Sequence, residues 1–372
     1  MDLSVVVGTR PEIVKMAPIV LALREEGIPF SLVHTGQHYD QELSRVFLEE
    51  LGLGSPDAVL DVGSGTQAKQ TAEALIHLEA HFAQDPPRLI LVEGDTNTVL
   101  AAALAGAKLG VDVGHVEAGL RSHDLRMPEE HNRRLTDHLS SFLYAPTDVA
   151  AKNLRQEAVW GTIWITGNTV IDATIRYLPL AEARSNVMDL VPFDRFCLVT
   201  AHRAENVDDL ETLGELVDLL RRAPLPVVYP VHPRAEGRLE DAGLYEKLQA
   251  SQNVQLLPPQ GYFDFLVLMK RSTCILTDSG GIQEEATSPA LRKKVFVFRR
   301  GTERPEAVAA GYTRVVGTTA QKAIVAMKEF LNDPAAPTAP SPYGDGTGGA
   351  QIASLVRKTL AKGPGPLGQR TS

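Results

Sequence analysis

The chain alternates short β-rich runs with helical patterns, and it does so twice. In each half, runs rich in Val, Ile and Leu are followed by segments with apolar residues at helical spacing. The predicted strands cover residues 3–7, 30–34, 88–92, 111–116, 142–145 and 163–166, and then 196–200, 226–229, 254–257, 274–277, 294–298 and 313–316. This alternation is typical of βαβ units and a mostly parallel sheet. We therefore predict an α/β fold with two Rossmann-like, doubly wound domains.

The length of the chain supports two domains. Its 372 residues exceed the size at which a single core usually stops growing. We predict an N-terminal domain over residues 1–167, joined by a C-terminal helix over 350–361, and a C-terminal domain over 168–349, with a flexible tail at 362–372. Ligands of open α/β sheets lie at the carboxyl ends of the strands, so two sheets that face each other would place their ligand loops across a central cleft.

Charge and cysteine content exclude several classes of protein. The net charge of -9 argues against a general nucleic-acid binder, although a local cluster of basic groups and helix starts can still hold a phosphate. Cys197 and Cys274 lie in apolar runs without zinc-ligand spacing. The N-terminus lacks a signal-peptide pattern, and no run approaches the roughly 18 apolar residues of a membrane span. We expect a cytoplasmic protein with no metal, no nucleic-acid partner and no membrane segment.

The loop after the first predicted strand carries two basic residues, Arg10 and Lys15, in the motif GTRPEIVKMAP. Pro11 suits the first turn of the helix that follows. A solvated helix start accounts for this pattern equally well. The loop lacks GxGxxG, so the fingerprint of nicotinamide dinucleotide binding is missing.

Ionisable residues follow the next strands of the first half. Asp95, in EGDTNT, comes directly after an apolar run, where it or Thr96 could also cap the next helix. The following strand ends in GHVEAGLRS, which adds His115, Glu117 and Arg121. In MPEEHNRR, Glu129 and Arg133 lie one turn apart, a spacing that surface salt bridges also use. Packing alone does not explain so many ionisable groups at one sheet edge.

In the second half, the motif TDSGGIQEEA joins a strand to a helix through Ser279, Gly280 and Gly281. Backbone N–H groups of such a turn can approach a pyrophosphate at the positive end of the helix dipole. Glu285, further along the helix, is placed to accept from ribose hydroxyls. Arg304, in TERPEA, adds a planar donor suited to phosphate. His202 and His232 follow two other strands of this half.

The set GTRPE, TGQHYD, GDTNT, HVEAGLR, PEExNR, GNTVID, AHRxEN, DSGGIQEEA and TERPE resembles the non-hydrolysing UDP-N-acetylglucosamine 2-epimerase family, from residue 3 to about 360. The resemblance implies two Rossmann-like domains in the GT-B arrangement and a homodimer. It also implies an isomerase that supplies UDP-N-acetylmannosamine for surface polysaccharides.

The resemblance assigns residues by motif. It places nucleotide contacts on Arg10, Gln260, Phe265, Ser279, Gly280, Gly281, Glu285 and Arg304. It places catalytic groups on Lys15, Asp95, Glu117, Glu129, Arg133 and His202. The chain departs from the family pattern at Ala204, where a second Arg is usual, and after His232, where Asn-Pro is common.

A cofactor-free route follows from the chemistry of the substrate. The proton on carbon 2 is not next to a carbonyl, so direct abstraction is too difficult for a protein base. Without a nicotinamide, elimination of UDP to a glycal and re-addition remain, which the resemblance also implies. We expect Asp95, Glu117 and Glu129 to share the acid and base work, and His202, Arg10 and Arg304 to stabilise the departing diphosphate. Which carboxylate takes the proton stays open.

Other functions fit parts of the pattern. A hydrolysing epimerase, an epimerase of a 2,3-diacetamido uronic acid, a GT-B glycosyltransferase and a nucleotide-sugar sensor without turnover are the alternatives. Product analysis separates the two epimerases, whereas the glycosyltransferase would need an acceptor groove and the sensor would bind substrate without turnover.

Regulation by a second substrate molecule, described for many bacterial members of the family, depends on a Gln and an Arg. The chain has Asp40 and Lys69 at these positions. A carboxylate and a point charge suit a diphosphate less well than an amide and a guanidinium. We therefore expect the activating site to be weak or absent.

Overall fold

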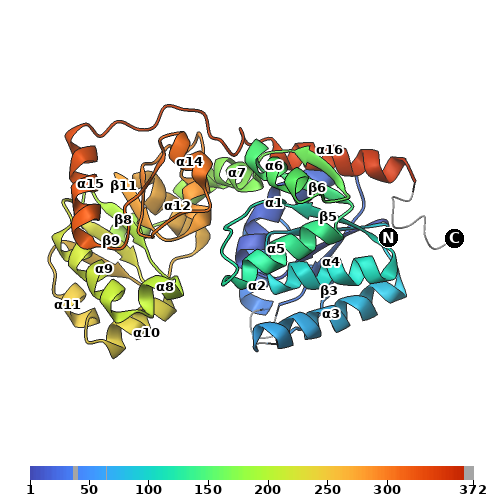
Figure 1. The fold of residues 1–372 in the computed structure, drawn as a ribbon, viewed down its shortest axis with the longest axis horizontal. Coiled ribbons are helices and arrows are strands. Elements are labelled where there is room, and N and C mark those ends of the chain that lie inside the picture. The colour runs from blue at the N-terminus through green and yellow to red at the C-terminus, as the bar shows by residue number, and fades with distance from the viewer. Residues whose placement is uncertain (37–40, 64, 364–372) are drawn as a thin grey trace. The chain divides into compact units, whose positions relative to one another are not determined.

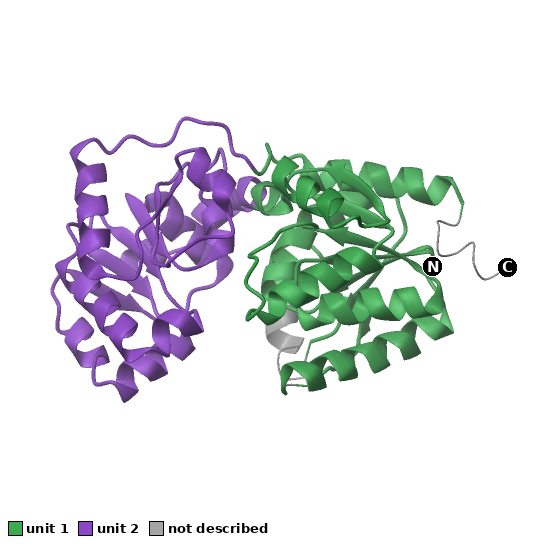
Figure 2. Ribbon diagram, in the orientation of Figure 1, with its two compact units in different colours: residues 1–173, 343–372 green, residues 174–342 purple. Residues whose placement is uncertain are grey.

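The computed structural model describes residues 1–36, 41–63 and 65–363, without the side chains of residues 41–45 (Figure 1). The chain divides into two compact units (Figure 2). Unit 1 comprises Met1–Ala173 and the segment that begins at Tyr343, and unit 2 comprises Thr174–Pro342.

Unit 1 contains one parallel sheet with the order β3-β2-β1-β4-β5-β6-β7. Its strands are β1 (Leu3–Val7), β2 (Ser31–His34), β3 (Ala58–Val59), β4 (Leu89–Glu93), β5 (Asp112–Val116), β6 (Phe142–Ala145) and β7 (Thr162–Ile165). The strand order reverses between β1 and β4, the position at which open α/β sheets bind their ligands. All residues of β1, β4 and β5 are buried, as expected of central strands covered on both faces.

Helices cover the sheet of unit 1. They are α1 (Arg10–Glu25), α2 (Gln41–Glu50), α3 (Gln67–Gln84), α4 (Asn97–Leu109), α5 (Pro128–Leu139), α6 (Asp148–Gln156), the start of α7 (Thr169–Arg184), and α16 (Gly348–Ala361). The last of these comes from the far end of the chain and packs on α1 (Figure 1). Gly349 permits this approach, because a Cβ there would lie 2.9 Å from the backbone of Pro18.

The units divide at a different place from the predicted domains. The division falls inside α7, after Ala173, whereas the sequence placed it at residue 167. Residues 343–349 belong to unit 1, not to the predicted 168–349 domain. Hydrogen bonds explain this placement, since Asn168 N donates to Tyr343 O at 2.7 Å and Gly349 N donates to Asp172 Oδ1 at 2.8 Å.

Unit 2 repeats the design with the order β10-β9-β8-β11-β12-β13, again all parallel. Its strands are β8 (Cys197–Thr200), β9 (Val227–Pro230), β10 (Val254–Leu257), β11 (Cys274–Thr277), β12 (Val295–Val297) and β13 (Thr313–Val315). Its helices are the rest of α7, η2 (Val187–Leu190), α8 (Ala204–Val207), α9 (Leu210–Arg222), α10 (Pro233–Asp241), α11 (Tyr245–Gln249), α12 (Tyr262–Arg271), α13 (Gly280–Glu285), α14 (Pro305–Ala309) and α15 (Ala320–Asn332).

The two cysteines are buried neighbours in the core of unit 2. Cys197 and Cys274 lie opposite each other on β8 and β11, both as free thiols. Among the described residues, no helix is long and apolar enough to cross a membrane.

Candidate active site

Lys15 joins two carboxylates at the carboxyl edge of the sheet of unit 1. Its Nζ lies 2.6 Å from Glu117 Oε2 and 3.1 Å from Glu93 Oε1. Asn168 donates from Nδ2 to the same oxygen of Glu117 at 2.9 Å. Glu117 is thus held by a cation and an amide donor.

Glu117 has an unusual backbone conformation. Its φ is +68°, in the left-handed region that residues with a Cβ rarely adopt. Such strain costs about 1–3 kcal/mol and tends to occur at functional sites. The next turn needs glycine, because Gly119 has φ +85° and a Cβ there would lie 2.3 Å from Ala150 O. The loop after β5 therefore turns sharply to place the Glu117 carboxylate beside Lys15.

Two further carboxylates, which the sequence analysis did not select, lie next to this cluster. Burial raises the pKa of Glu93 well above its usual range; Lys15 lowers it and Glu117 raises it further. Burial also raises the pKa of Glu12, although hydrogen bonds lower it in part. Glu12 accepts from Gly8 N at 2.7 Å and from Thr9 Oγ1 at 2.9 Å, so it braces the loop after β1. Glu12 lies in the motif GTRPE and Glu93 in EGDTNT, but neither residue is among the predicted site residues.

Glu93→Gln is expected to raise the melting temperature, by an amount that grows as the pH rises above the unfolded pKa toward the raised pKa of the folded protein. The folded protein binds the Glu93 proton more tightly than the unfolded chain does, since the folded pKa is raised. Stability is therefore lost as the pH rises from the unfolded value of about 4.3 through the folded value. A neutral glutamine removes this loss, which calorimetry at several pH values measures.

Glu73→Gln is the control for this measurement, because Glu73 lies partly exposed in an i,i+4 pair with Lys69 at 3.6 Å. Its effect should be small at every pH. A Glu93→Gln difference that stays constant or shrinks as the pH rises contradicts the assignment.

Helix α5 holds Asp95 on two sides. Arg133 Nη2 lies 2.6 Å from Asp95 Oδ2, and Asn132 Nδ2 donates to the Asp95 carbonyl at 2.9 Å. Thr96, not Asp95, is the N-cap of α4, and its Oγ1 accepts from Val99 N at 3.4 Å. The Asp95 carboxylate therefore does not cap the helix and pairs with Arg133 instead. Asp95 is therefore fixed between the end of β4 and the start of α5.

Arg133 does not use the partner that helical spacing offered. It bonds Asp95 and also lies 3.2 Å from Glu130, rather than pairing with Glu129. Arg133 is buried whereas Glu129, near the start of α5, is half-buried. Residue spacing along α5 cannot predict this partner, because Asp95 lies in the loop after β4.

In unit 2, Asp278 organises the loop that carries His202. Asp278 Oδ1 lies 3.1 Å from His202 Nδ1. Its Oδ2 accepts from the backbone N of His202 and of Arg203 at 2.9 Å and from Asn206 Nδ2 at 3.0 Å. Burial by itself raises the pKa of Asp278, but His202 and these donors outweigh it, so the pKa is lowered. Asp278 lies in the motif TDSGGIQEEA but is not among the predicted site residues.

The predicted phosphate loop starts helix α13. Ser279 is the N-cap, and its backbone N donates to Thr277 Oγ1 at 2.9 Å. Arg304 Nε donates to the buried carboxylate of Glu284. Gly280 leaves room for this guanidinium, because a Cβ there would lie 3.3 Å from Arg304 Nη2. Arg304 is thus a buried, ion-paired group against the start of α13.

The remaining predicted residues are spread over both units. Arg10 is exposed at the start of α1. Gln260 Nε2 donates to Pro258 O at 2.7 Å, while Phe265 is half-buried on α12 and Glu285 is buried on α13. Gly281 follows Gly280 in the first turn of α13. These roles in nucleotide binding stay predictions.

His232 follows β9, and Lys69 lies at a position predicted for regulation. His232 Nδ1 accepts from Arg234 N at 3.2 Å and so caps α10, with its ring centroid 5.5 Å from that of His202. Lys69 is largely exposed near the start of α3. Gln37 and Asp40 lie outside the described residues.

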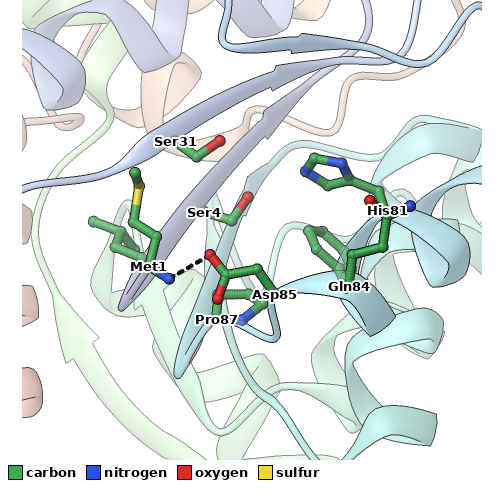
Figure 3. Close-up of a pocket in the computed structure, with 9 residues that line it drawn as sticks. Met1, Ser4, Ser31, His81, Gln84, Asp85 and Pro87 are labelled. Carbon is green, nitrogen blue, oxygen red and sulfur yellow. Dashed lines mark hydrogen bonds and ion pairs between the residues drawn. The ribbon is translucent and has the colours of Figure 1, made fainter.

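A cavity of about 160 Å³ lies at the opposite edge of the unit 1 sheet (Figure 3). Ser4 and Ser31, near the amino ends of β1 and β2, line it together with Phe82 of α3. Substrates of such sheets bind at the carboxyl ends of the strands, so this cavity lies apart from the candidate site.

These features define a Rossmann-like α/β protein of two units, with an acid–base cluster in one and a Gly-rich helix start in the other. The fold is GT-B-like, since a glycotransferase of kitacinnamycin has the same fold, with a TM-score of 0.60 at 13% identity.

Residues 21–357 match the family model described as UDP-N-acetylglucosamine 2-epimerase. The UDP-N-acetylglucosamine 2-epimerase of Methanocaldococcus jannaschii is 42% identical over 365 residues, which cover 96% of this chain and 99% of the relative. A crystal structure of that enzyme in complex with UDP-GlcNAc and UDP superposes with a TM-score of 0.87, covering 96% of this chain and 100% of the other. The chain belongs to the UDP-N-acetylglucosamine 2-epimerase family.

A relative with another substrate name is also similar. The UDP-2,3-diacetamido-2,3-dideoxy-D-glucuronate 2-epimerase of Pseudomonas aeruginosa is 37% identical over 371 residues, which cover 97% of this chain and 100% of the relative.

Proposed function

We propose that this chain is a non-hydrolysing epimerase that interconverts UDP-N-acetylglucosamine and UDP-N-acetylmannosamine in the cytoplasm, as a homodimer and without a cofactor. Family membership supports the reaction class. The observation that carries the proposal is the pair of Glu117, bound to Lys15, and Asp95, bound to Arg133, at the ends of the neighbouring strands β4 and β5.

The proposed reaction passes through a glycal. A carboxylate accepts the carbon 2 proton, the electron pair forms a double bond between carbons 1 and 2, and the bond from carbon 1 to UDP breaks. UDP then adds back while the proton returns from the other face. Lys15 and Asn168 orient the Glu117 carboxylate, while Asp95 and the half-buried Glu129 are the other candidates for acid and base.

The departing UDP carries the negative charge that develops in this reaction. In unit 2, His202 is oriented by Asp278, and α13 begins with backbone N–H groups at Gly280 and Gly281. Preorganised donors of this kind stabilise developing charge because they need no rearrangement during the reaction. Arg10 and Arg304 are proposed to assist the diphosphate, and Gln260, Phe265 and Glu285 to bind the nucleoside.

Incubation with UDP-N-acetylglucosamine in heavy water tests the proposal. Product and recovered substrate should both acquire deuterium at carbon 2, and the sugar should stay attached to UDP. Proton NMR and mass spectrometry follow both changes without added NAD or divalent metal.

Three outcomes would contradict parts of the proposal. Free N-acetylmannosamine as the main product contradicts the non-hydrolysing assignment. Activity that disappears after thorough chelation contradicts the cofactor-free one. Turnover restricted to a UDP-2,3-diacetamido uronic acid, tested in parallel because of the similarity to the Pseudomonas aeruginosa enzyme, identifies the alternative substrate.

A further inference from the structure

A buried hydrogen-bond network binds the two loops of unit 1 that carry the candidate catalytic carboxylates, Asp95 and Glu117. His115, on β5, has no exposed surface. Its Nδ1 lies 2.7 Å from Asp137 Oδ1, and its Nε2 lies 2.8 Å from the Gly94 carbonyl oxygen. The other oxygen of Asp137 accepts from Gly119 N at 3.2 Å and from Arg121 Nη2 at 2.7 Å.

The partners of His115 constrain its ring. The Asp137 carboxylate and the Gly94 carbonyl, which face its two nitrogens, are both oxygen acceptors. The Asp137 carboxylate also accepts from Gly119 N and from Arg121 Nη2. Arg121 is shared with Glu157, whose Oε2 lies 2.6 Å from Arg121 Nη2. Every group that faces His115 through these bonds is therefore an acceptor, which leaves the ring one orientation.

The network ends at the two loops that carry the catalytic carboxylates. Gly94 immediately precedes Asp95 and has φ +88°, and its carbonyl is fixed by His115. Gly119 follows Glu117 by two residues, and its N–H is fixed by Asp137. The contact between His115 and Asp137 thus links the backbone of both loops.

Helix α5, which carries Asp137, also binds Asp95 directly. Asn132 and Arg133 of α5 bond the carbonyl and the carboxylate of Asp95, and Asp137 lies one turn further along α5 than Arg133. α5 thus binds the carbonyl and the carboxylate of Asp95, while His115 of β5, paired with Asp137 of α5, binds the Gly94 carbonyl before it.

A gain in stability does not by itself explain why these charged groups are buried. Burying ions costs free energy that their attraction often only balances, and apolar replacements of similar volume can be equally stable. We propose that His115 and Asp137 are positioning residues, which hold Asp95 and Glu117 in the spacing that the reaction needs. This inference rests on the proposed function for the roles of these two carboxylates.

The test compares His115→Ala, His115→Gln and Asp137→Asn with the full-length wild-type protein. His115→Ala should lower kcat by about a hundredfold, the scale of a misplacement near 1 Å, and change KM and the Kd of UDP less than about twofold. His115→Gln should have a kcat about tenfold higher than that of His115→Ala, because the glutamine amide can still donate toward the Gly94 carbonyl. In an Asp95→Asn background, His115→Ala should lower the rate only slightly further, because the effects of residues that act as a unit are not additive. Deuterium exchange at carbon 2 measures this rate.

Ser141→Ala is the matched control. It removes a buried hydrogen bond of 2.6 Å to Asp112 at the other end of β5. It should lower the melting temperature and leave kcat unchanged. A kcat of His115→Ala equal to that of Ser141→Ala, a loss that appears in KM, or full additivity with Asp95→Asn would overturn the inference.

Failure of the proposed function is recognised separately. If the wild-type protein leaves UDP-N-acetylglucosamine unchanged, the proposed function fails while the network is still tested by NMR. Asp137→Asn should abolish the protection of the Gly119 amide from hydrogen exchange. An unchanged Gly119 amide overturns the network as described.

Discussion

Glu117→Gln is expected to lower kcat by about a thousandfold or more, within the range that removal of a general acid or base produces. Glutamine keeps the shape of the side chain but neither accepts nor releases a proton. Lys15 stays beside Glu93, and Asn168 can donate to the glutamine oxygen, so the local structure should persist. Initial rates of sugar interconversion and deuterium exchange at carbon 2 measure the loss, and calorimetry with UDP measures retained binding.

Glu79→Gln is the control for this variant, because Glu79 is exposed on α3 of the same unit. It should change kcat by less than about twofold, as surface substitutions away from a site usually do. A Glu117→Gln protein that exchanges the carbon 2 proton at the wild-type rate excludes Glu117 as the acid or base and leaves Asp95 and Glu129.

His202→Ala is expected to lower kcat by about a hundredfold or more, the scale for removal of one preorganised electrostatic donor. Asp278 Oδ1 lies 3.1 Å from His202 Nδ1, and Asp278 Oδ2 accepts from the backbone N of His202 and of Arg203 at 2.9 Å. The backbone bonds survive the substitution, so the loop should keep its shape. The loss should therefore appear in kcat more than in the melting temperature.

Arg222→Ala provides a comparison within unit 2, since Arg222 forms an exposed i,i+4 pair with Asp218 on α9. Its kcat should match that of the wild-type protein. A His202→Ala rate equal to the Arg222→Ala rate would show that His202 does not assist the departure of UDP.

Most of the fold could be predicted from the chain. The ends of the predicted strands agree with the structure to within one residue, because buried parallel strands are short apolar runs bounded by loops. The exception is β3, which has only two residues, is not fully buried and lacks a pattern. It is recognised as a strand only from its pairing with Val33 and His34 of β2.

The candidate site could be predicted only in part. Motifs marked Lys15, Asp95, Glu117 and His202, because these residues follow strands at the edge where ligands bind. Partners were harder to predict, as Arg133 shows, since its helical neighbour Glu129 is not the carboxylate that it bonds.

The sequence by itself determined the two α/β halves, the family, and the residue types at the strand ends, because periodicity and local motifs are written along the chain. Tertiary structure alone decided that Glu93 lies beside Lys15 and that Asp137 faces His115. It also decided that the segment after Tyr343 returns to unit 1. The physical reason is that burial, pKa shifts and ion pairs depend on groups far apart in sequence, whose distances are set only when the strands and helices pack.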